Sequence, residues 1–448
     1  MRVKTKDEVI LLTSEINAIL GIDDIFKAPT RLMEILLDQR EREKVFNQVL
    51  ELSRKNSIGV DLDFWHTYFQ DEVAERNKKK QDFTPMSVGN LVAKLVGGGT
   101  SYFEPAAGTG GMMIAHWHQN EAKNTLYYVE ELSERTFPFL LFNMMIRGIE
   151  GVAVRCDSLT GEVHEAFRAE KQNRDCEFSG FEPKSDTQLK RYSDIVMMNP
   201  PFSANWSADS KFLSDPRFER FGKLAPKSKA DFSFLLHGFY HLKDNGTMGI
   251  VLPHGVLFRG ASEGVIRKTL LEMGAIYAVI GLPPNIFYGT SIPTVVLILK
   301  KNRTTRDVFF IDASKDFEKQ KNQNSLRPSD IHKIVDAYKA RENIEKYAHL
   351  ASFDKIVSND YNLNIPRYVD TFEEEEQIDI VALSREMTDL NSQIKQKETE
   401  FLSLLDELAI TDDTKELIAA TKQIFIYEGI WTRIICNIKF INWTTKTK

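Results

Sequence analysis

Residues 103–113 read Phe103-Glu-Pro-Ala-Ala-Gly-Thr-Gly-Gly-Met-Met113, and they are the most informative part of this sequence for its fold. They predict a strand that ends at Glu104, a glycine-rich turn and a helix that begins near Gly111. Gly108 and Gly110 permit backbone dihedrals that a Cβ atom would forbid, and they let backbone N–H groups approach a ligand closely. Met113 stands where a dinucleotide fingerprint has its third glycine, and no Gly-Lys-Ser/Thr follows. The turn is therefore neither that fingerprint nor a nucleotide-triphosphate P-loop.

Short apolar runs alternate with amphipathic stretches on both sides of this turn, from about residue 84 to residue 312. The runs predict strands at residues 102–104, 126–129, 152–155, 195–198, 249–252, 275–280, 295–300 and 308–311. Helical spacing occurs between the earlier runs, over residues 133–147 and 231–242. Such alternation predicts an α/β fold, with a parallel sheet covered by helices on both faces. In such sheets ligands bind beyond the carboxyl ends of the strands.

Acidic residues follow the second and third expected strands. Glu130 and Glu131 follow the second strand, where a carboxylate can accept hydrogen bonds from both hydroxyls of a ribose. Asp157 follows the third strand and can accept from an adenine amino group. Together with the glycine turn, these strand ends suit an adenosine ligand that carries no phosphate. The alternative is that the glutamates only complement the dipole of the next helix.

The tetrapeptide Asn199-Pro-Pro-Phe202 directly follows the strand expected at residues 195–198. Tandem prolines end a strand and leave carbonyl groups without competing N–H donors. The side-chain oxygen of Asn199 and the carbonyl of Pro200 can then both accept from one planar NH₂ group, which frees its lone pair for attack. Phe202 can stack on the ring that bears this amine. The alternative is an ordinary strand-terminating turn with a core phenylalanine.

The two ends of the chain have helical sequence patterns and lack the strand–helix alternation of the middle. We expect a helical N-terminal region over residues 1–80, a catalytic domain over residues 81–370, and an acidic linker with a helical partner-binding region over residues 371–448. Apolar residues recur in steps of three and four from Ile380 to Leu408, broken only at Lys397. This heptad pattern favours a coiled-coil-like helix that binds a partner helix, over one that packs on its own domain.

Composition excludes several classes of protein. The chain has 448 residues, a net charge of −6 and a hydrophobic fraction of 42%, which suits a globular enzyme. An acidic balance argues against coating nucleic acid by charge alone. Three scattered cysteines predict neither a disulfide framework nor a metal site, and no stretch predicts a signal peptide or a membrane span. A cytoplasmic protein is expected.

The two motifs together resemble those of amino-group DNA methyltransferases that use S-adenosylmethionine. Further stretches narrow the resemblance to the modification (methyltransferase) subunit of type I restriction–modification systems. These stretches are Gln81-Asp-Phe-Thr-Pro85, residues 251–260, residues 281–290 with Ile292-Pro293, and residues 360–368. The resemblance covers roughly residues 60 to 410 and implies a Rossmann-like methyltransferase sheet.

The resemblance also implies roles for individual residues. Those assigned to the target base are Asn199, Pro200, Pro201 and Phe202. Those assigned to the cofactor are Gln81, Phe83, Thr84, Pro85, Glu104, Gly108, Thr109, Gly110, Gly111, Glu131 and Asp157. Within this set the entry motif at residues 81–85 contacts the methionine end, Glu131 rather than Glu130 binds the ribose, and Asp157 reaches the adenine.

The function implied is methyl transfer from S-adenosylmethionine to the exocyclic amine of adenine in duplex DNA, with the base flipped out of the helix. The implied partners are a specificity subunit bound through the C-terminal helix, a second copy of this chain in a two-to-one complex, and a motor nuclease added for restriction. Two alternatives remain at this level. One is a stand-alone methyltransferase acting on RNA or protein glutamine, and the other is a non-catalytic assembly subunit.

Overall fold

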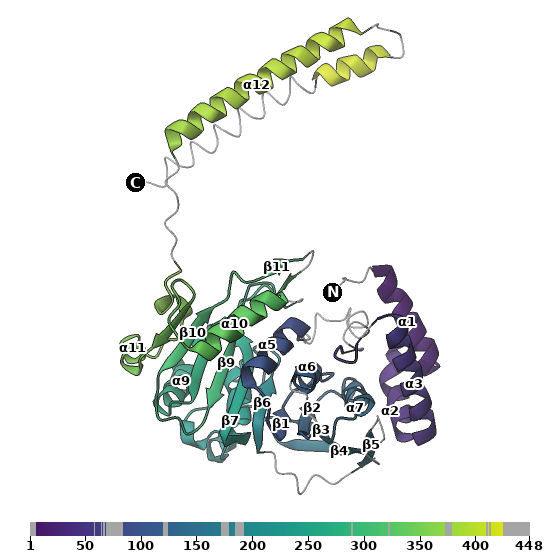
Figure 1. The fold of residues 1–448 in the computed structure, drawn as a ribbon, viewed down its shortest axis with the longest axis vertical. Coiled ribbons are helices and arrows are strands. Elements are labelled where there is room, and N and C mark those ends of the chain that lie inside the picture. The colour runs from purple at the N-terminus through teal and green to yellow at the C-terminus, as the bar shows by residue number, and fades with distance from the viewer. Residues whose placement is uncertain are drawn as a thin grey trace. The chain divides into compact units, whose positions relative to one another are not determined.

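The computed structural model describes residues 6–57, 59–63, 65, 68, 84–119, 124–171, 179–183, 192–287, 290–320, 323–371, 379–408, 411 and 414–423. They belong to two compact units, residues 1–372 and residues 373–448. The first unit contains a large sheet with helices around it, and the second contains a long helix (Figure 1). None of the described helices is long and apolar enough to cross a membrane.

The sheet of the first unit has eleven strands in the order β13-β10-β8-β9-β7-β6-β1-β2-β3-β4-β5. Its strands are β1 Ser101–Glu104, β2 Leu126–Glu131, β3 Gly151–Asp157, β4 Glu162–Lys171, β5 Ser179–Pro183, β6 Ser193–Met198, β7 Leu242–Pro253, β8 Ile276–Gly281, β9 Thr294–Lys300, β10 Val308–Asp312 and β13 Ala348–Ala351. All eight strands expected from the sequence are present. A separate two-stranded sheet pairs β11 Glu318–Lys319 with β12 Asn324–Ser325.

The expected parallel pairing is confirmed for most of the expected strands and is wrong for β9. Strands β3, β2, β1, β6 and β7 are parallel neighbours, as are β8 and β10. Strand β9 lies antiparallel between β7 and β8. Strands β4, β5 and β13 add antiparallel pairs towards the edges. The parallel centre is the part that places the polar strand ends together.

Helices cover both faces of the sheet because the buried side chains alternate along each strand. Tyr102 and Tyr127 join the core formed with α5 Met86–Val96, α6 Gly111–Gln119, α7 Phe137–Ile146 and α10 Pro328–Ala340. The next residues, Phe103 and Tyr128, join the opposite core, formed with α8 Asp231–His241 and α9 Ala261–Glu272. The coverage expected from the sequence is confirmed.

The N-terminal helices pack on the same face as α7. They are α1 Lys6–Leu20, α2 Ala28–Leu37 and α3 Gln39–Lys55. Asp38 begins α3, because its side chain accepts from the backbone N–H of Glu41 at 2.9 Å. The rings of Phe46 in α3 and Phe142 in α7 meet edge to face, with centroids 4.8 Å apart. These helices therefore share the core on which the polar strand ends rest.

The second unit consists of α12 Ile380–Glu407 and a shorter helical stretch at residues 414–423. The side chain of Asp379 starts α12 by accepting from the N–H groups of Val381 and Ala382. None of the residues of α12 is buried within the described part of the chain. The helix expected from the heptad pattern is confirmed.

Candidate functional site

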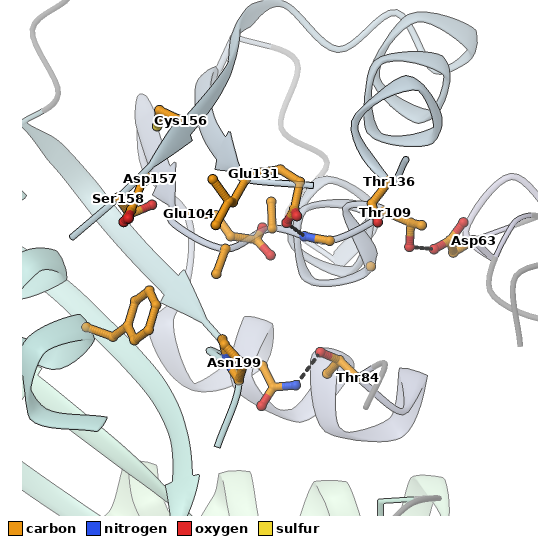
Figure 2. Close-up of a pocket in the computed structure, with 17 residues that line it drawn as sticks. Asp63, Thr84, Glu104, Thr109, Glu131, Thr136, Cys156, Asp157, Ser158 and Asn199 are labelled. Carbon is orange, nitrogen blue, oxygen red and sulfur yellow. Dashed lines mark hydrogen bonds between the residues drawn. The ribbon is translucent and has the colours of Figure 1, made fainter. Parts of the chain in front are cut away.

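A pocket opens where the parallel strands β1, β2, β3 and β6 end (Figure 2). Each of these strands contributes a polar side chain at or just beyond its end, and the glycine turn lies among them. The residues that line the pocket are Asp63, Thr84, Glu104, Ala106, Ala107, Gly108, Thr109, Gly111, Glu131, Leu132, Thr136, Cys156, Asp157, Ser158, Asn199, Pro201 and Phe234. The site thus gathers residues from separate stretches of sequence.

The glycine turn serves the pocket in two ways. An added Cβ atom on Gly108 or Gly111 would meet nothing within 4 Å, so both glycines border open space. Gly110 has a φ of +91°, and an added Cβ atom would lie 2.8 Å from Cε of Met113 and 2.9 Å from Cδ1 of Leu140. Gly110 is absent from the pocket lining, so the structure requires it for backbone conformation and packing.

Glu131 and its neighbour Glu130 have different environments. The carboxylate of Glu131 lines the pocket and accepts from the N–H of Gly108 and of Ser133, each at 2.8 Å. Burial raises the pKa of Glu131, and these N–H groups oppose that rise. Glu130 is fully buried, with Oε2 3.1 Å from Nε2 of His237. The structure therefore places the expected ribose-binding carboxylate, Glu131, at the pocket.

Asp157 lies at the end of β3 and is held by the turn that follows it. Its Oδ1 atom accepts from the N–H groups of Leu159 and Thr160 at 2.9 and 3.2 Å. The guanidinium of Arg217 donates to the carbonyls of Ser158 and Leu159 at 2.8 and 2.9 Å. These contacts tie the turn that follows Asp157 to Arg217.

Glu104, at the end of β1, is buried and lines the pocket. The hydroxyl of Tyr102 donates to its Oε2 atom at 2.5 Å. Burial raises the pKa of Glu104 to about 8, and the nearby charge of Glu131 acts in the same direction. Burial therefore favours the neutral form of the Glu104 carboxyl group in the ligand-free pocket.

Asn199 presents an oxygen atom that no described residue satisfies. Its Nδ2 group donates to Oγ1 of Thr84 at 2.9 Å, as the dashed line in Figure 2 marks. Its Oδ1 atom is buried and has no hydrogen-bond partner among the described residues. A buried acceptor left without a partner costs free energy, so this oxygen is ready for a donor from a ligand.

The other three residues of the Asn-Pro-Pro-Phe turn differ in whether they line the pocket. Pro201 lines the pocket, whereas Pro200 and Phe202 do not. The ring of Phe202 packs edge to face on Phe287, with centroids 5.2 Å apart. Stacking of Phe202 on a target ring therefore stays a prediction.

The entry motif is only partly described. Gln81 and Phe83 lie outside the described residues. Thr84 lines the pocket and bonds Asn199, while Pro85 precedes the first turn of α5 and is absent from the lining. Within the described part of the chain, no group of three or more His, Cys, Asp or Glu side chains could hold a metal ion.

Sequence reasoning missed Asp63, which lines the pocket from outside the sheet. Its carboxylate accepts from the hydroxyl of Thr109 and from Nδ2 of Asn143, the latter at 2.8 Å. No motif in the sequence marks this residue, because its position depends on how the segment after α3 packs against α7. Phe234 of α8 was missed for the same reason, since nearly every residue of this helix is buried and no motif distinguishes Phe234.

Comparisons with known proteins agree on one family. Residues 64–377 match the family model described as N-6 DNA Methylase. The chain is 32% identical over 382 residues to the type I restriction enzyme MpnII methylase subunit of Mycoplasma pneumoniae, covering 82% of this chain and 67% of that protein. It is 27% identical over 430 residues to the MjaVII methylase subunit of Methanocaldococcus jannaschii, covering 89% and 69% of the two chains.

A solved structure is similar as well. The methyltransferase subunit of a type I restriction–modification system from Streptococcus thermophilus is 40% identical to this chain, with a TM-score of 0.60. The match covers 81% of this chain and 80% of that structure.

Proposed function

We propose a specific reaction for this chain, which belongs to the N-6 DNA methylase family. Its pocket transfers a methyl group from S-adenosylmethionine to the exocyclic amine of adenine in duplex DNA. The chain is a methyltransferase of the type I restriction–modification class. This supports the expectation of a DNA methylase over a methyltransferase of RNA or protein glutamine. The proposal adds the identity of the base, the atom modified and the methyl donor.

The residues of the pocket fit S-adenosylmethionine. Glu131 offers carboxylate oxygens for ribose hydroxyls, and Asp157 offers an acceptor for the adenine amino group. The space in front of Gly108 and Gly111 lets backbone groups approach the ligand. When bound, the cofactor supplies an electrophilic methyl group on a sulfonium. The protein's task is then to place the target amine in line with that methyl group.

The observation that carries the proposal is the buried, unpartnered Oδ1 atom of Asn199. The Nδ2 group of Asn199 already donates to Thr84, so the Oδ1 atom is the part of the amide that can accept from a ligand. An exocyclic NH₂ group is such a donor, and accepting from it concentrates electron density on its nitrogen. A fixed acceptor in a site that excludes water stabilises the transition state without reorganising. The target base must leave the duplex to reach this position.

Substitution of Asn199 tests this assignment. We expect Asn199→Ala to lower methylation of adenine in duplex DNA by at least about 100-fold, in the range seen when one preorganised group is removed. Binding of S-adenosylmethionine should change by less than about twofold, because the assigned cofactor contacts lie on other residues. The measurement is transfer of labelled methyl groups by the full complex, beside calorimetric cofactor titration of the chain.

Asn47→Ala provides a matched control, since Asn47 is exposed on α3 and lies outside the pocket lining. It should leave both methylation and cofactor binding unchanged. Methylation by Asn199→Ala at the wild-type rate would contradict the assignment of Asn199. Recovery of the methyl group on cytosine would contradict adenine as the target.

The remaining partners are part of the same proposal. The chain acts with a specificity subunit that chooses the DNA site, with a second copy of itself, and with a motor nuclease when DNA is cut. The apolar seam of α12 supports a helical partner, because its side chains are exposed in the described part of the chain. The relatives named above are subunits of type I restriction enzymes, which supports an assembly of this kind.

A further inference from the structure

Asp63 ties the N-terminal region to the glycine turn. It lies in the segment that follows α3, and its Oδ2 atom accepts from the hydroxyl of Thr109 (Figure 2). Its Oδ1 atom accepts from Nδ2 of Asn143 in α7 at 2.8 Å and from the N–H of Trp65 at 3.0 Å. The carboxylate is therefore fixed from several directions while it still lines the pocket.

Arg147 holds this segment against α7. Its side chain is buried, with the residue only 6% exposed, and it donates to the carbonyls of Val60 and Leu62 at 2.8 and 2.6 Å. Burial lowers the pKa of Arg147 to about 10, and the charges of Asp63 and Asp61 oppose that lowering. The guanidinium thus stays protonated at neutral pH. A buried cation that bonds two backbone carbonyls leaves Asp63 little freedom to move away.

Thr109 and Asp63 occupy the end of the pocket that lies away from Asp157 and Ser158 (Figure 2). With the adenine at Asp157 and the ribose at Glu131, the amino-acid part of a bound cofactor would extend towards this end. That part carries an ammonium group, whose strongest partner is a carboxylate. Glu104 is another acid nearby, but its burial raises its pKa and favours the neutral form in the ligand-free pocket.

We propose that Asp63 binds the ammonium group of S-adenosylmethionine while it holds Thr109 of the glycine turn in place. The inference rests on the proposed function and extends it, because it makes the segment after the N-terminal helices part of the cofactor site. Cofactor binding would then require the N-terminal region as well as the sheet.

The experiment is calorimetric titration of the full chain, wild type and Asp63→Asn, with three ligands. S-adenosylmethionine and S-adenosylhomocysteine carry the amino-acid end, whereas 5′-methylthioadenosine keeps the adenosine and sulfur but lacks it. Asp63→Asn should weaken the first two by about tenfold or more, as loss of one charge-assisted contact predicts. It should change the affinity for 5′-methylthioadenosine by less than about twofold.

Asp61→Asn is the matched control, since Asp61 is two residues away, carries the same charge and is absent from the pocket lining. It should leave all three affinities within about twofold of the wild type. The melting temperature of each ligand-free variant shows whether it folds. Asp63→Ser, with a smaller side chain, tests the same expectation if Asp63→Asn proves unstable.

An equal loss of affinity for all three ligands would overturn the proposal, because it would show only that the pocket is distorted. Unchanged affinity of Asp63→Asn for S-adenosylmethionine would overturn it too. Failure of the wild-type chain to bind S-adenosylmethionine would instead overturn the proposed cofactor, and this inference with it. The wild-type titration therefore separates the two failures.

Discussion

Glu104 shows how one residue of the site is shaped by its surroundings. A carboxyl group at the end of β1 has lost its water, so its neutral form is favoured and its pKa rises to about 8. The unfolded chain would release this proton near pH 4.5. Between these two pH values the folded state holds a proton that the unfolded state has lost. The stabilising contribution of Glu104 is therefore present at low pH and is lost as the pH rises towards 8.

Glu104→Gln should remove this pH dependence, because the amide resembles the protonated carboxyl group and does not titrate. The free energy of unfolding of the wild type, relative to that of the variant, should fall between pH 5 and pH 8. The limiting slope is roughly 1.4 kcal/mol per pH unit, the value for one proton. Urea unfolding of the ligand-free chain at several pH values measures it. A difference that stays constant across this range would contradict the raised pKa.

Helix α12 carries a row of apolar side chains that are exposed in the described part of the chain. Its apolar seam is exposed along the whole helix, and Leu390 and Ile394 in its middle are 50% and 55% exposed. A seam of heptad spacing that stays in water is unfavourable, whereas burial against a partner helix stabilises it. The seam therefore supports α12 as the contact with the specificity subunit.

Replacing Leu390 and Ile394 together by serine should abolish co-purification with the specificity subunit and, with it, methylation of DNA. Cofactor binding should be unchanged, because neither residue lines the pocket. The control replaces Arg385 and Thr399 by serine, since both are exposed and each lies about 200° around the helix from the seam positions on either side of it. If the seam variant still assembles with the specificity subunit, α12 is not the contact.

At the scale of the whole molecule, the net charge of −6 becomes informative. Non-specific DNA affinity comes mainly from neutralised phosphates, so an acidic subunit depends on its partners for much of that contact. We expect the isolated chain to bind duplex DNA weakly and without sequence preference. Fluorescence anisotropy at low and physiological salt, with and without the specificity subunit, measures this. Tight, sequence-selective binding by the chain alone would contradict it.

Local patterns account for much of the fold. Each of the eight expected strands is present, because a short apolar run between turn residues has few other ways to bury itself. The α12 helix also follows from its own periodicity. Strands β4, β5 and β13 were not predicted, since their sequences are not apolar runs. Their strand conformation depends on pairing with neighbouring strands.

The candidate site divides in the same manner. Local sequence predicts the glycine turn and the Asn-Pro-Pro-Phe turn, because glycine and proline act on the local backbone. It also predicts that the acidic strand ends lie together, because the carboxyl ends of parallel strands meet at one edge of the sheet. The tertiary structure alone packs Phe202 on Phe287. It also brought Asp63 to Thr109, and it turned β9 antiparallel. Such outcomes depend on contacts between segments distant in sequence, which no local pattern encodes.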